Sequence, residues 1–274
     1  MKFQFLGTAA AEGIPSLFCD CEVCRISRER GGKHLRSRAQ SLIDGKLLLD
    51  FGPDTYFHFT RFGLNLTDIE NCLITHSHFD HLSTLELAVL QEWGAHPREG
   101  YRFNLFGSRD LECIKPEFIE KLGGKLSVNI IPPFEPTKIG DYTVTALNAW
   151  HGTTEPFIYL ISDGEKTVLY ANDTDSLPES SMDYLKKTRP AIDLVAADCT
   201  AGNSPEIMYR AHMGMIQNRE LRGALIELGC ITADTPYYLN HFSHNGYDVL
   251  YDEFCEIVEK EGFKVAFDGL EIEL

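Results

Sequence analysis

The chain has 274 residues, 43% of them hydrophobic, and its 25 basic and 41 acidic side chains leave a formal net charge of −16. This size suffices for one large domain or two tightly fused halves, and nothing resembles a disordered tail. The negative charge opposes unaided binding to DNA or tRNA, whereas a small substrate is easier to accommodate. The sequence has neither a run of about 18 apolar residues nor the apolar segment of a signal peptide, so we expect a cytoplasmic protein.

A predicted strand at residues 1–7 leads into a loop of small residues and then into three closely spaced cysteines. Cys19, Cys21 and Cys24 are too crowded to be explained by packing, and a disulfide across C-x-C would be strained. Three thiolates converging on one zinc ion explain the cluster better, and they need a fourth ligand from elsewhere. The competing interpretation is a redox pair of Cys21 and Cys24, which the acidic neighbours disfavour.

Residues 25–38 are strongly basic. We interpret them as a solvated helix and loop; the alternative is that one or two of these cations reach a phosphate at the rim of a site. Residues 41–52 predict two strands joined by an Asp-Gly turn. Asp50 ends the second of these strands, and a buried carboxylate there is expected to orient a metal-bound histidine.

The stretch 75–81 has the pattern H-x-H-x-D-H, placed after an apolar run that predicts a buried strand and before a predicted helix. Along extended backbone, His76 and His78 point the same way and can face one ion. The turn into the helix re-aims Asp80 and His81, which can then face a second ion. Imidazole with carboxylate suits zinc, manganese or iron, and two such ions form a clamp for hydrolysis.

The rest of the chain predicts further strands and helices, with polar side chains at several strand ends. His151, Asp173, Asp198 and His241 each follow a predicted strand, and His212 precedes a predicted helix. Sites on open sheets collect at such strand ends. The predicted strands are 101–106, 125–131, 142–147, 157–161, 167–170, 193–198, 237–239 and 263–267, and the predicted helices are 82–89, 111–122, 216–228 and 247–259.

Seven of these side chains suffice for a two-metal site. Three histidines would hold one ion, a carboxylate and two histidines the other, and Asp173 would bridge them. The seven are His76, His78, Asp80, His81, His151, Asp173 and His241.

The order and spacing of these ligands resemble those of the metallo-β-lactamase-fold hydrolases over essentially the whole chain. The resemblance implies the α+β class and a four-layer αβ/βα sandwich. It also implies a single domain over residues 1–274, made of two fused αβ halves with a zinc knuckle near residues 19–24. The site would lie at one edge between the halves and hold two divalent ions, zinc or manganese.

The cysteine cluster narrows the resemblance. Together with Gly7-Thr8 and Gly13-Ile14-Pro15, it looks like the phosphoribosyl 1,2-cyclic phosphate phosphodiesterases, whose additional zinc is structural. In that branch a His-x-x-His pair supplies one histidine to each metal centre. The resemblance therefore implies that His241 belongs to the dinuclear site and that His244 is the fourth ligand of the cysteine zinc.

Two departures accompany this likeness. Ala9 and Ala10 stand where the branch tends to have glycine, so the loop is expected to approach a substrate less closely. A related branch, tied to pyrroloquinoline quinone biosynthesis, shares the cysteine knuckle. In that branch some ligands of the H-x-H-x-D-H motif are replaced, whereas here all of them are present.

The predicted function is a metal-dependent phosphodiesterase that hydrolyses a small phosphodiester, a cyclic one being favoured. A zinc-bound water titrates near about 7, so a metal-bridged hydroxide would be the nucleophile. His212 is the candidate general acid, and Asp80 would help to position the proton. The alternatives are a tRNA 3′-processing endoribonuclease, an ester or thioester hydrolase of the same fold, and a binding module without catalysis. The interval from Asp173 to Asp198 is too short for a tRNA-gripping arm, and a thioester hydrolase leaves the cysteine zinc unexplained.

The remaining histidines and cysteines are interpreted as structural. His34, His58 and His96 have no partner at a ligand spacing. The expected partner is a small phosphorylated substrate; neither a membrane nor nucleic acid is expected, and a homodimer stays open. Five cysteines in apolar runs are expected to be buried thiols, namely Cys72, Cys113, Cys199, Cys230 and Cys255.

Overall fold

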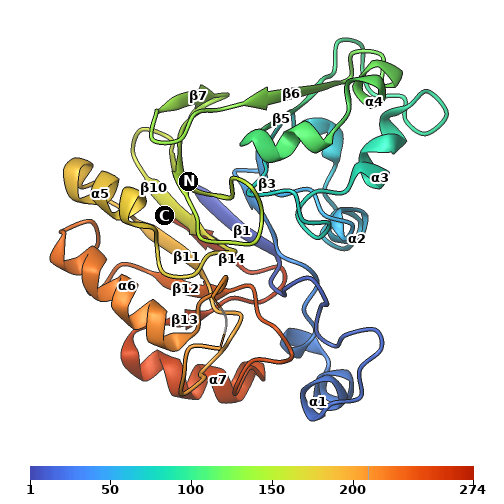
Figure 1. The fold of residues 1–274 in the computed structure, drawn as a ribbon. Coiled ribbons are helices and arrows are strands. Elements are labelled where there is room, and N and C mark those ends of the chain that lie inside the picture. Colours follow the sequence, from blue (N-terminus) through green and yellow to red (C-terminus); the bar gives the residue numbers. More distant parts are fainter. Residues whose placement is uncertain (209) are drawn as a thin grey trace.

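The computed structural model describes residues 1–208 and 210–274, which form two seven-stranded sheets with helices on their outer sides (Figure 1). The predicted α+β class and four-layer αβ/βα sandwich are confirmed. The first sheet has the order β14-β1-β2-β3-β4-β5-β6, and the second has the order β13-β12-β11-β10-β9-β8-β7. No helix of the described residues has the length and apolar character needed to cross a membrane.

Both sheets mix parallel and antiparallel pairs. Strands β3 to β6 are parallel to one another, as are β10 to β13, so their carboxyl ends meet at one edge of each sheet. The first sheet contains β1 (Lys2–Gly7), β2 (Gln40–Ile43), β3 (Leu47–Leu49), β4 (Asn71–Leu73), β5 (Phe103–Gly107), β6 (Leu126–Ile130) and β14 (Glu271–Glu273). The second contains β7 (Thr137–Ile139), β8 (Tyr142–Asn148), β9 (Phe157–Ser162), β10 (Thr167–Ala171), β11 (Leu194–Asp198), β12 (Tyr237–Asn240) and β13 (Lys264–Val265).

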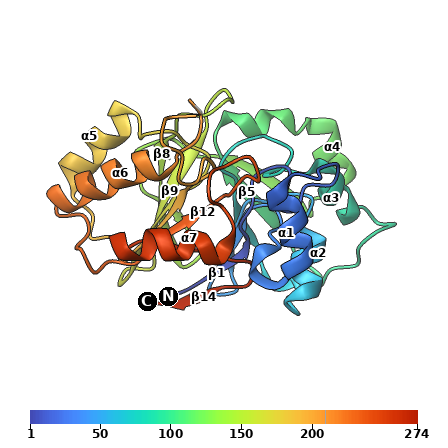
Figure 2. The same ribbon diagram turned by 90° about the horizontal axis from the view of Figure 1, so that it is seen from below.

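The helices form two outer layers on opposite sides of the strands (Figure 2). Helices α5, α6 and α7 accompany the second sheet, whereas α2, α3 and α4 accompany the first (Figure 1). The α-helices are α1 (Glu22–Arg30), α2 (Thr55–Arg61), α3 (Thr84–Leu87), α4 (Pro116–Lys121), α5 (Glu179–Thr188), α6 (Met215–Glu227) and α7 (Tyr251–Val258). Short 3-10 helices are η1 (Gly32–His34), η2 (Leu66–Asp68), η3 (Ala88–Leu90), η4 (Arg109–Cys113) and η5 (Glu259–Glu261).

Three buried apolar clusters hold the layers together. Between the sheets, Phe3 packs near Tyr170 with ring centroids 6.4 Å apart, and Phe5 packs near Tyr238 at 5.8 Å. The other two clusters fill the space between each sheet and its helices. Each fully buried large apolar side chain contributes about 1.5–3 kcal/mol to the free energy of folding. The polar residues at the strand ends are therefore held by a stable, well-packed core.

The two chain ends are close together, because β1 pairs antiparallel with β14 in the register Lys2 to Glu273 (Figure 1). The sequence did not predict β14 or β7. Both are three-residue strands, too short for a period-of-two pattern to be recognised.

Most predicted strands are confirmed to within one or two residues, but the predicted helix over 111–122 is wrong as a single element. It is split into η4 and α4, because Pro116 lacks the amide hydrogen of a continuing helix and occupies the first turn of a new one. The predicted helix over 247–259 begins only at Tyr251, and the strand predicted over 263–267 is confined to Lys264 and Val265.

The prediction of a solvated basic segment over 25–38 fails at Arg36, which is 3% exposed. Its Nη1 atom donates to Thr8 Oγ1 at 2.9 Å and to the carbonyl of Ala266 at 2.6 Å. Its guanidinium also lies 4.2 Å from the ring centre of Phe242. A planar cation can be buried in this way because it stacks on an aromatic face while its hydrogens bond to oxygens.

Candidate metal centre

The seven candidate ligands converge at strand ends of both sheets. His76 and His78 follow β4, and His151 follows β8. Asp173 follows β10, and His241 follows β12. Because β10 and β12 flank the parallel strand β11, their carboxyl ends deliver side chains to one place.

One group of ligand atoms comes from three histidines. His76 Nε2 lies 2.9 Å from His78 Nδ1, and His151 Nε2 lies 3.0 Å from the same atom. The Nδ1 atom of His151 lies 2.9 Å from the carbonyl of Ala211, where it can only donate. That hydrogen bond leaves Nε2 of His151 as the nitrogen with a lone pair for a metal.

A second group comprises Asp80, His81 and His241, whose ligand atoms lie within 4.8 Å of one another. Asp173 stands between the two groups. Its Oδ2 atom is 3.1 Å from His81 Nε2 and 3.0 Å from His241 Nε2, whereas its Oδ1 atom is 3.7 Å from His151 Nε2. One carboxylate oxygen thus faces each group, as a bridging ligand requires.

The buried polar atoms at the centre of this arrangement fit a bound cation. His81 Nε2, Asp173 Oδ2 and His241 Nε2 are buried but make no hydrogen bond of good geometry. Each such buried atom without a hydrogen bond costs about 1–3 kcal/mol of folding free energy. A metal ion bound between the three lone pairs would satisfy all of them. Asp173 and His241 also have positive φ angles, of 52° and 59°, a conformation that non-glycine residues adopt mostly at functional sites.

Asp50 holds His81 from behind. Its Oδ2 atom accepts from His81 Nδ1 at 2.8 Å, while its Oδ1 atom accepts from the backbone and hydroxyl of Thr75 at 2.8 and 2.9 Å. The hydrogen on Nδ1 leaves Nε2 of His81 with its lone pair facing the centre. Asp50 therefore orients a candidate ligand, at the position where the sequence placed such a carboxylate.

Thr200 holds His241 in a similar way, although no sequence pattern pointed to this residue. The hydroxyl of Thr200 donates to the carbonyl of His241 at 2.8 Å, and its oxygen is 2.9 Å from His241 Nδ1. Because the single hydroxyl hydrogen is used, Nδ1 must be the donor in the second contact. His241 then also presents a lone pair on Nε2.

His212 lies beside the same centre and is held by Asp198. The distance from His212 Nδ1 to Asp198 Oδ2 is 2.7 Å, and the imidazole stacks on that of His241 with ring centroids 5.4 Å apart. Burial opposes the charged imidazolium, but the Asp198 carboxylate outweighs it and raises the pKa of His212 to about 9. The sequence places Asp198 at the end of a predicted strand, but it does not predict a role for this carboxylate in the site.

Asp198 also ties the surrounding loops together. It accepts from the backbone amides of Asp173 at 3.1 Å, Thr200 at 2.9 Å and Met213 at 3.2 Å. The backbone at Asp173, Thr200 and Met213 is thus fixed on one carboxylate, so His212 and Asp173 keep a set position relative to each other.

The three cysteines and His244 form a second candidate metal site. His244 Nδ1 lies 3.6 Å from Cys19 Sγ and 3.4 Å from Cys21 Sγ, and Cys24 completes the group within 4.8 Å. All eight cysteines are free thiols. Burial raises the pKa of Cys21, but the backbone amide of Cys24 and the ring of His244 outweigh this and lower it to about 6. Thiolate character and a tetrad of sulfur and nitrogen favour zinc.

A cleft of about 460 Å³ opens over the candidate dinuclear centre. No lysine or arginine is among the described residues that line it. Arg38 was a candidate for a rim cation, but its Nη1 atom pairs with Asp54 at 2.8 Å and its Nε donates to the carbonyl of Ala11. The lining residues are Ala10, Ala11, Glu12, His78, Asp80, His151, Asp173, Thr200, His212, His241, Ser243, His244 and Asn245.

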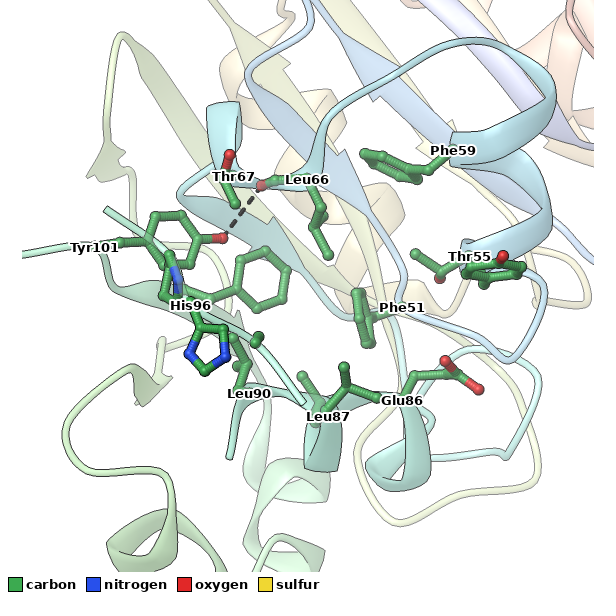
Figure 3. Close-up of a pocket in the computed structure, with 15 residues that line it drawn as sticks. Phe51, Thr55, Phe59, Leu66, Thr67, Glu86, Leu87, Leu90, His96 and Tyr101 are labelled. Carbon is green, nitrogen blue, oxygen red and sulfur yellow. Dashed lines mark hydrogen bonds between the residues drawn. The ribbon is translucent and has the colours of Figure 1, made fainter. Parts of the chain in front are cut away.

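A separate cavity of about 320 Å³ lies between α2, α3 and the first sheet, and shares no residue with the cleft (Figure 3). Aromatic and aliphatic side chains such as Phe51 and Phe59 form most of its wall. The hydroxyl of Tyr101 donates to the carbonyls of Leu66 at 3.2 Å and Ile69 at 2.9 Å. Among the described residues that line this cavity, no buried side-chain nitrogen or oxygen lacks a hydrogen-bond partner.

The residues interpreted as structural have mixed surroundings. His58 is buried, with Nδ1 2.7 Å from Gln40 Oε1, and His34 lies 3.1 Å from Asp252. His96 lines the apolar cavity. The prediction that Cys113 is a buried thiol is wrong, because η4 turns it outward and it is exposed.

A family model for the beta-lactamase superfamily domain matches residues 46–235, which is well over half of the chain. The chain belongs to this superfamily. The fold and the His/Asp clusters agree with its metallo-β-lactamase-fold, metal-dependent hydrolases. The fold implies divalent metal ions at the edge where the seven candidate ligands meet.

Curated relatives are distant. The coenzyme PQQ synthesis protein B of Methylorubrum extorquens is 26% identical over the whole of both chains. An octanoyltransferase of Porphyromonas gingivalis is 25% identical over 69% of this chain, but the chain spans only 38% of that protein.

Solved structures match over the whole chain. A diphosphatase of the PhnP family has a TM-score of 0.75 and 22% identity, covering 100% of this chain and 97% of the other. The short form of human tRNase Z has a TM-score of 0.67 and 16% identity, covering 100% and 99%. At these identities the likeness establishes the fold.

Proposed function

We propose that the chain is a metal-dependent phosphodiesterase that hydrolyses a small, cyclic phosphodiester. The observation that carries the proposal is the pair of ligand groups that share Asp173, together with the unsatisfied buried atoms at their centre. His76, His78 and His151 would hold one ion. Asp80, His81 and His241 would hold the other.

Two divalent ions bound there would supply a nucleophile at neutral pH and neutralise charge on the phosphoryl oxygens. The protein's own residues set the geometry. Asp50 and Thr200 fix the imidazoles of His81 and His241, so that little reorganisation is needed when a substrate enters. Asp80 is buried, with its Oδ2 atom 3.1 Å from His81 Nε2, and it forms part of the floor of the cleft.

His212 is the proposed general acid for the leaving alkoxide. It lines the cleft, and the contact of its Nδ1 atom with Asp198 orients the imidazole there. The same carboxylate favours the protonated imidazole that donation requires. A positioned acid of this kind contributes about 10²–10⁴-fold to the rate when the leaving group is poor.

Charge and cleft size support a small substrate over an RNA. The net charge is −16, and no lysine or arginine is found among the described lining residues. Between β10 and β11 the chain forms only α5 and short loops, which leaves no arm to grip tRNA. The likeness in fold to tRNase Z is therefore compatible with the proposed catalytic centre, but it is no argument for a tRNA substrate.

The proposed cytoplasmic setting is consistent with eight free cysteines, since a reducing compartment keeps thiols available for zinc. The proposed structural zinc would be held by Cys19, Cys21, Cys24 and His244. A single-domain organisation over the whole chain is likewise proposed, because apolar packing joins both sheets along their length.

The test is hydrolysis by zinc- or manganese-loaded protein of four probes: bis-p-nitrophenyl phosphate, ribose 1,2-cyclic phosphate, a pre-tRNA and a glutathione thioester. We expect turnover of the two diesters only, and its loss in His76→Ala. His96→Ala, which changes a histidine of the apolar cavity, is the matched control and should stay active. Turnover of the thioester without either diester would overturn the proposal in favour of an ester hydrolase.

A further inference from the structure

One carboxylate of the cleft is not a candidate metal ligand of either site. Glu12 lies in the loop after β1 and lines the cleft on the side of the cysteine site. The hydroxyl of Ser243 donates to Glu12 Oε1, and this oxygen lies 3.9 Å from Nε2 of His244. The side chain of Glu12 keeps 28% of its surface exposed, so the carboxylate is accessible from the cleft.

The loop that carries Glu12 is fixed at several points. The amide of Ala10 donates to the carbonyl of Phe242 at 2.9 Å, and the amide of Gly13 donates to Ala10 at 3.0 Å. Arg38 Nε donates to the carbonyl of Ala11 at 2.6 Å. The backbone on both sides of Glu12 is therefore fixed, and the hydroxyl of Ser243 holds one oxygen of its carboxylate.

No basic side chain of the described residues neutralises this carboxylate. Its one ion-pair contact in the described part of the chain is the imidazole of His244, and Arg38 is engaged with Asp54 instead. A second phosphate on the substrate would face an uncompensated negative charge here, whereas the scissile phosphodiester would be held by the metal ions. Such a like-charge contact is a common way of excluding a competing ligand.

The neighbouring groups suit a hydroxyl. Asn245 lines the same wall and offers both an amide donor and a carbonyl acceptor, and its backbone amide donates to Ser243 Oγ at 3.0 Å. A hydroxyl can donate to the Glu12 carboxylate and accept from an amide at once. An ionised phosphate only accepts hydrogen bonds and would leave the Glu12 carboxylate unpaired. An ammonium only donates them and would leave the amide donor of Asn245 unpaired.

We propose that Glu12 is a specificity residue that contacts the substrate, accepting a hydrogen bond from a sugar hydroxyl and repelling a second phosphate. The inference rests on the proposed phosphodiesterase function and deepens it. It defines the substrate class as cyclic phosphodiesters of a sugar that carries no further phosphate.

The experiment compares kcat/KM for two probes, ribose 1,2-cyclic phosphate and its 5-phosphorylated form, in the metal-loaded full-length protein. We expect the wild type to prefer the unphosphorylated probe by at least about tenfold, and Glu12→Gln to narrow this ratio by about tenfold through a lower KM for the phosphorylated probe. Glu86→Gln, at the edge of the apolar cavity, is the matched loss of one negative charge and should leave the ratio unchanged.

Zinc content separates substrate contact from a structural role, because Glu12 also faces His244. Equal loss of both activities in Glu12→Gln, with loss of the zinc bound by the cysteines, would overturn the proposal and make Glu12 a support of that site. An unchanged ratio with full zinc would also overturn it, while leaving the phosphodiesterase intact. A wild type that hydrolyses neither these probes nor bis-p-nitrophenyl phosphate would overturn both proposals.

Discussion

The cleft over the candidate dinuclear centre and the apolar cavity beside α2 are both hollows that side chains line, yet their polar atoms behave in opposite ways. In the cleft, His81 Nε2, Asp173 Oδ2 and His241 Nε2 are buried without a hydrogen bond of good geometry. In the cavity, the hydroxyl of Tyr101 donates to the carbonyl of Leu66 (Figure 3). It also donates to the carbonyl of Ile69.

The comparison teaches that the shape of a hollow does not reveal its chemistry. Buried lone pairs without a hydrogen bond are destabilising unless a bound ligand satisfies them. Their clustering therefore indicates a cation-binding site. The cavity wall instead belongs to the packing of the first sheet against its helices. Substitutions in the two hollows should therefore differ in kind, changing activity in one and stability in the other.

The largest expected effect comes from Asp173→Asn, which keeps the size of the side chain but removes the charge shared by both ligand groups. We expect a loss of about 10³-fold or more in phosphodiester turnover, together with loss of bound metal, because electrostatic stabilisation by the centre is the main catalytic resource. Metal content by mass spectrometry and kcat/KM are the measurements.

Tyr101→Phe is the counterpart in the apolar cavity. It removes the hydroxyl that bonds to Leu66 and Ile69, and should lower the free energy of unfolding by about 1 kcal/mol without changing turnover or metal content. If Asp173→Asn retained its metals and its turnover, the distinction between the two hollows would be lost.

His212→Ala is expected to have the next largest effect, of about 10²–10⁴-fold on a cyclic sugar phosphate whose alkoxide needs a proton. With bis-p-nitrophenyl phosphate the effect should be much smaller, because p-nitrophenolate leaves without protonation. Steady-state kinetics on the two substrates measure the difference. An equal loss on both would show that His212 supports the centre and is not the acid.

Cys21→Ser should remove the zinc bound by the cysteines and His244 while the dinuclear centre keeps its two ions. The loss of a metal cross-link between the loop before α1 and the segment after β12 should lower Tm by about 5 °C or more. Metal analysis and thermal unfolding are the measurements, and the exposed Cys113→Ser is the control. A content of about three metals per chain in both the wild type and Cys21→Ser would contradict a metal site at the cysteines.

The last prediction concerns stability alone and its dependence on pH through His58, which lies on α2 near the cavity. Burial lowers the pKa of His58 to about 4, below the value of about 6.5 in an unfolded chain. Stability is therefore fully present above pH 6.5, and it falls as the pH drops from about 6.5 to about 4, where only the unfolded chain gains the proton. The loss should reach about 2–3 kcal/mol.

Urea unfolding at pH 7 and pH 4.5 checks this dependence. His58→Gln should lower stability at pH 7, because the contacts with Gln40 and Ser37 change, but should reduce the additional loss at pH 4.5. A variant whose loss between the two pH values equals that of the wild type would assign the dependence to other groups.

Much of the candidate site follows from local sequence pattern, because side-chain direction at a strand end depends on backbone geometry alone. The alternation of extended backbone predicts that His76 and His78 face one ion, whereas the assignment of His241 and His244 to different sites follows from the family resemblance. The order and spacing of those motifs resemble a known family, and that resemblance implied the four-layer architecture.

Other features depend on contacts between distant segments and left no local signal. Thr200 meets His241 across 41 positions, and Ser243 meets Glu12 across 231. Arg36 was expected in solvent because charged runs usually are, and its burial depends on Phe242 and Ala266 from the far end of the chain.

The sequence by itself thus determined which residue types can bind metal and at which strand ends they lie, because residue chemistry and backbone periodicity are local. Only the tertiary structure decided which nitrogen of each histidine faces the centre. Asp50 and Thr200 hold Nδ1 of His81 and His241, and both Nε2 atoms then face the centre without a hydrogen bond of good geometry. Hydrogen bonds between segments distant in sequence fix those orientations, and they form because β3 pairs with β4 in the first sheet and β11 pairs with β12 in the second.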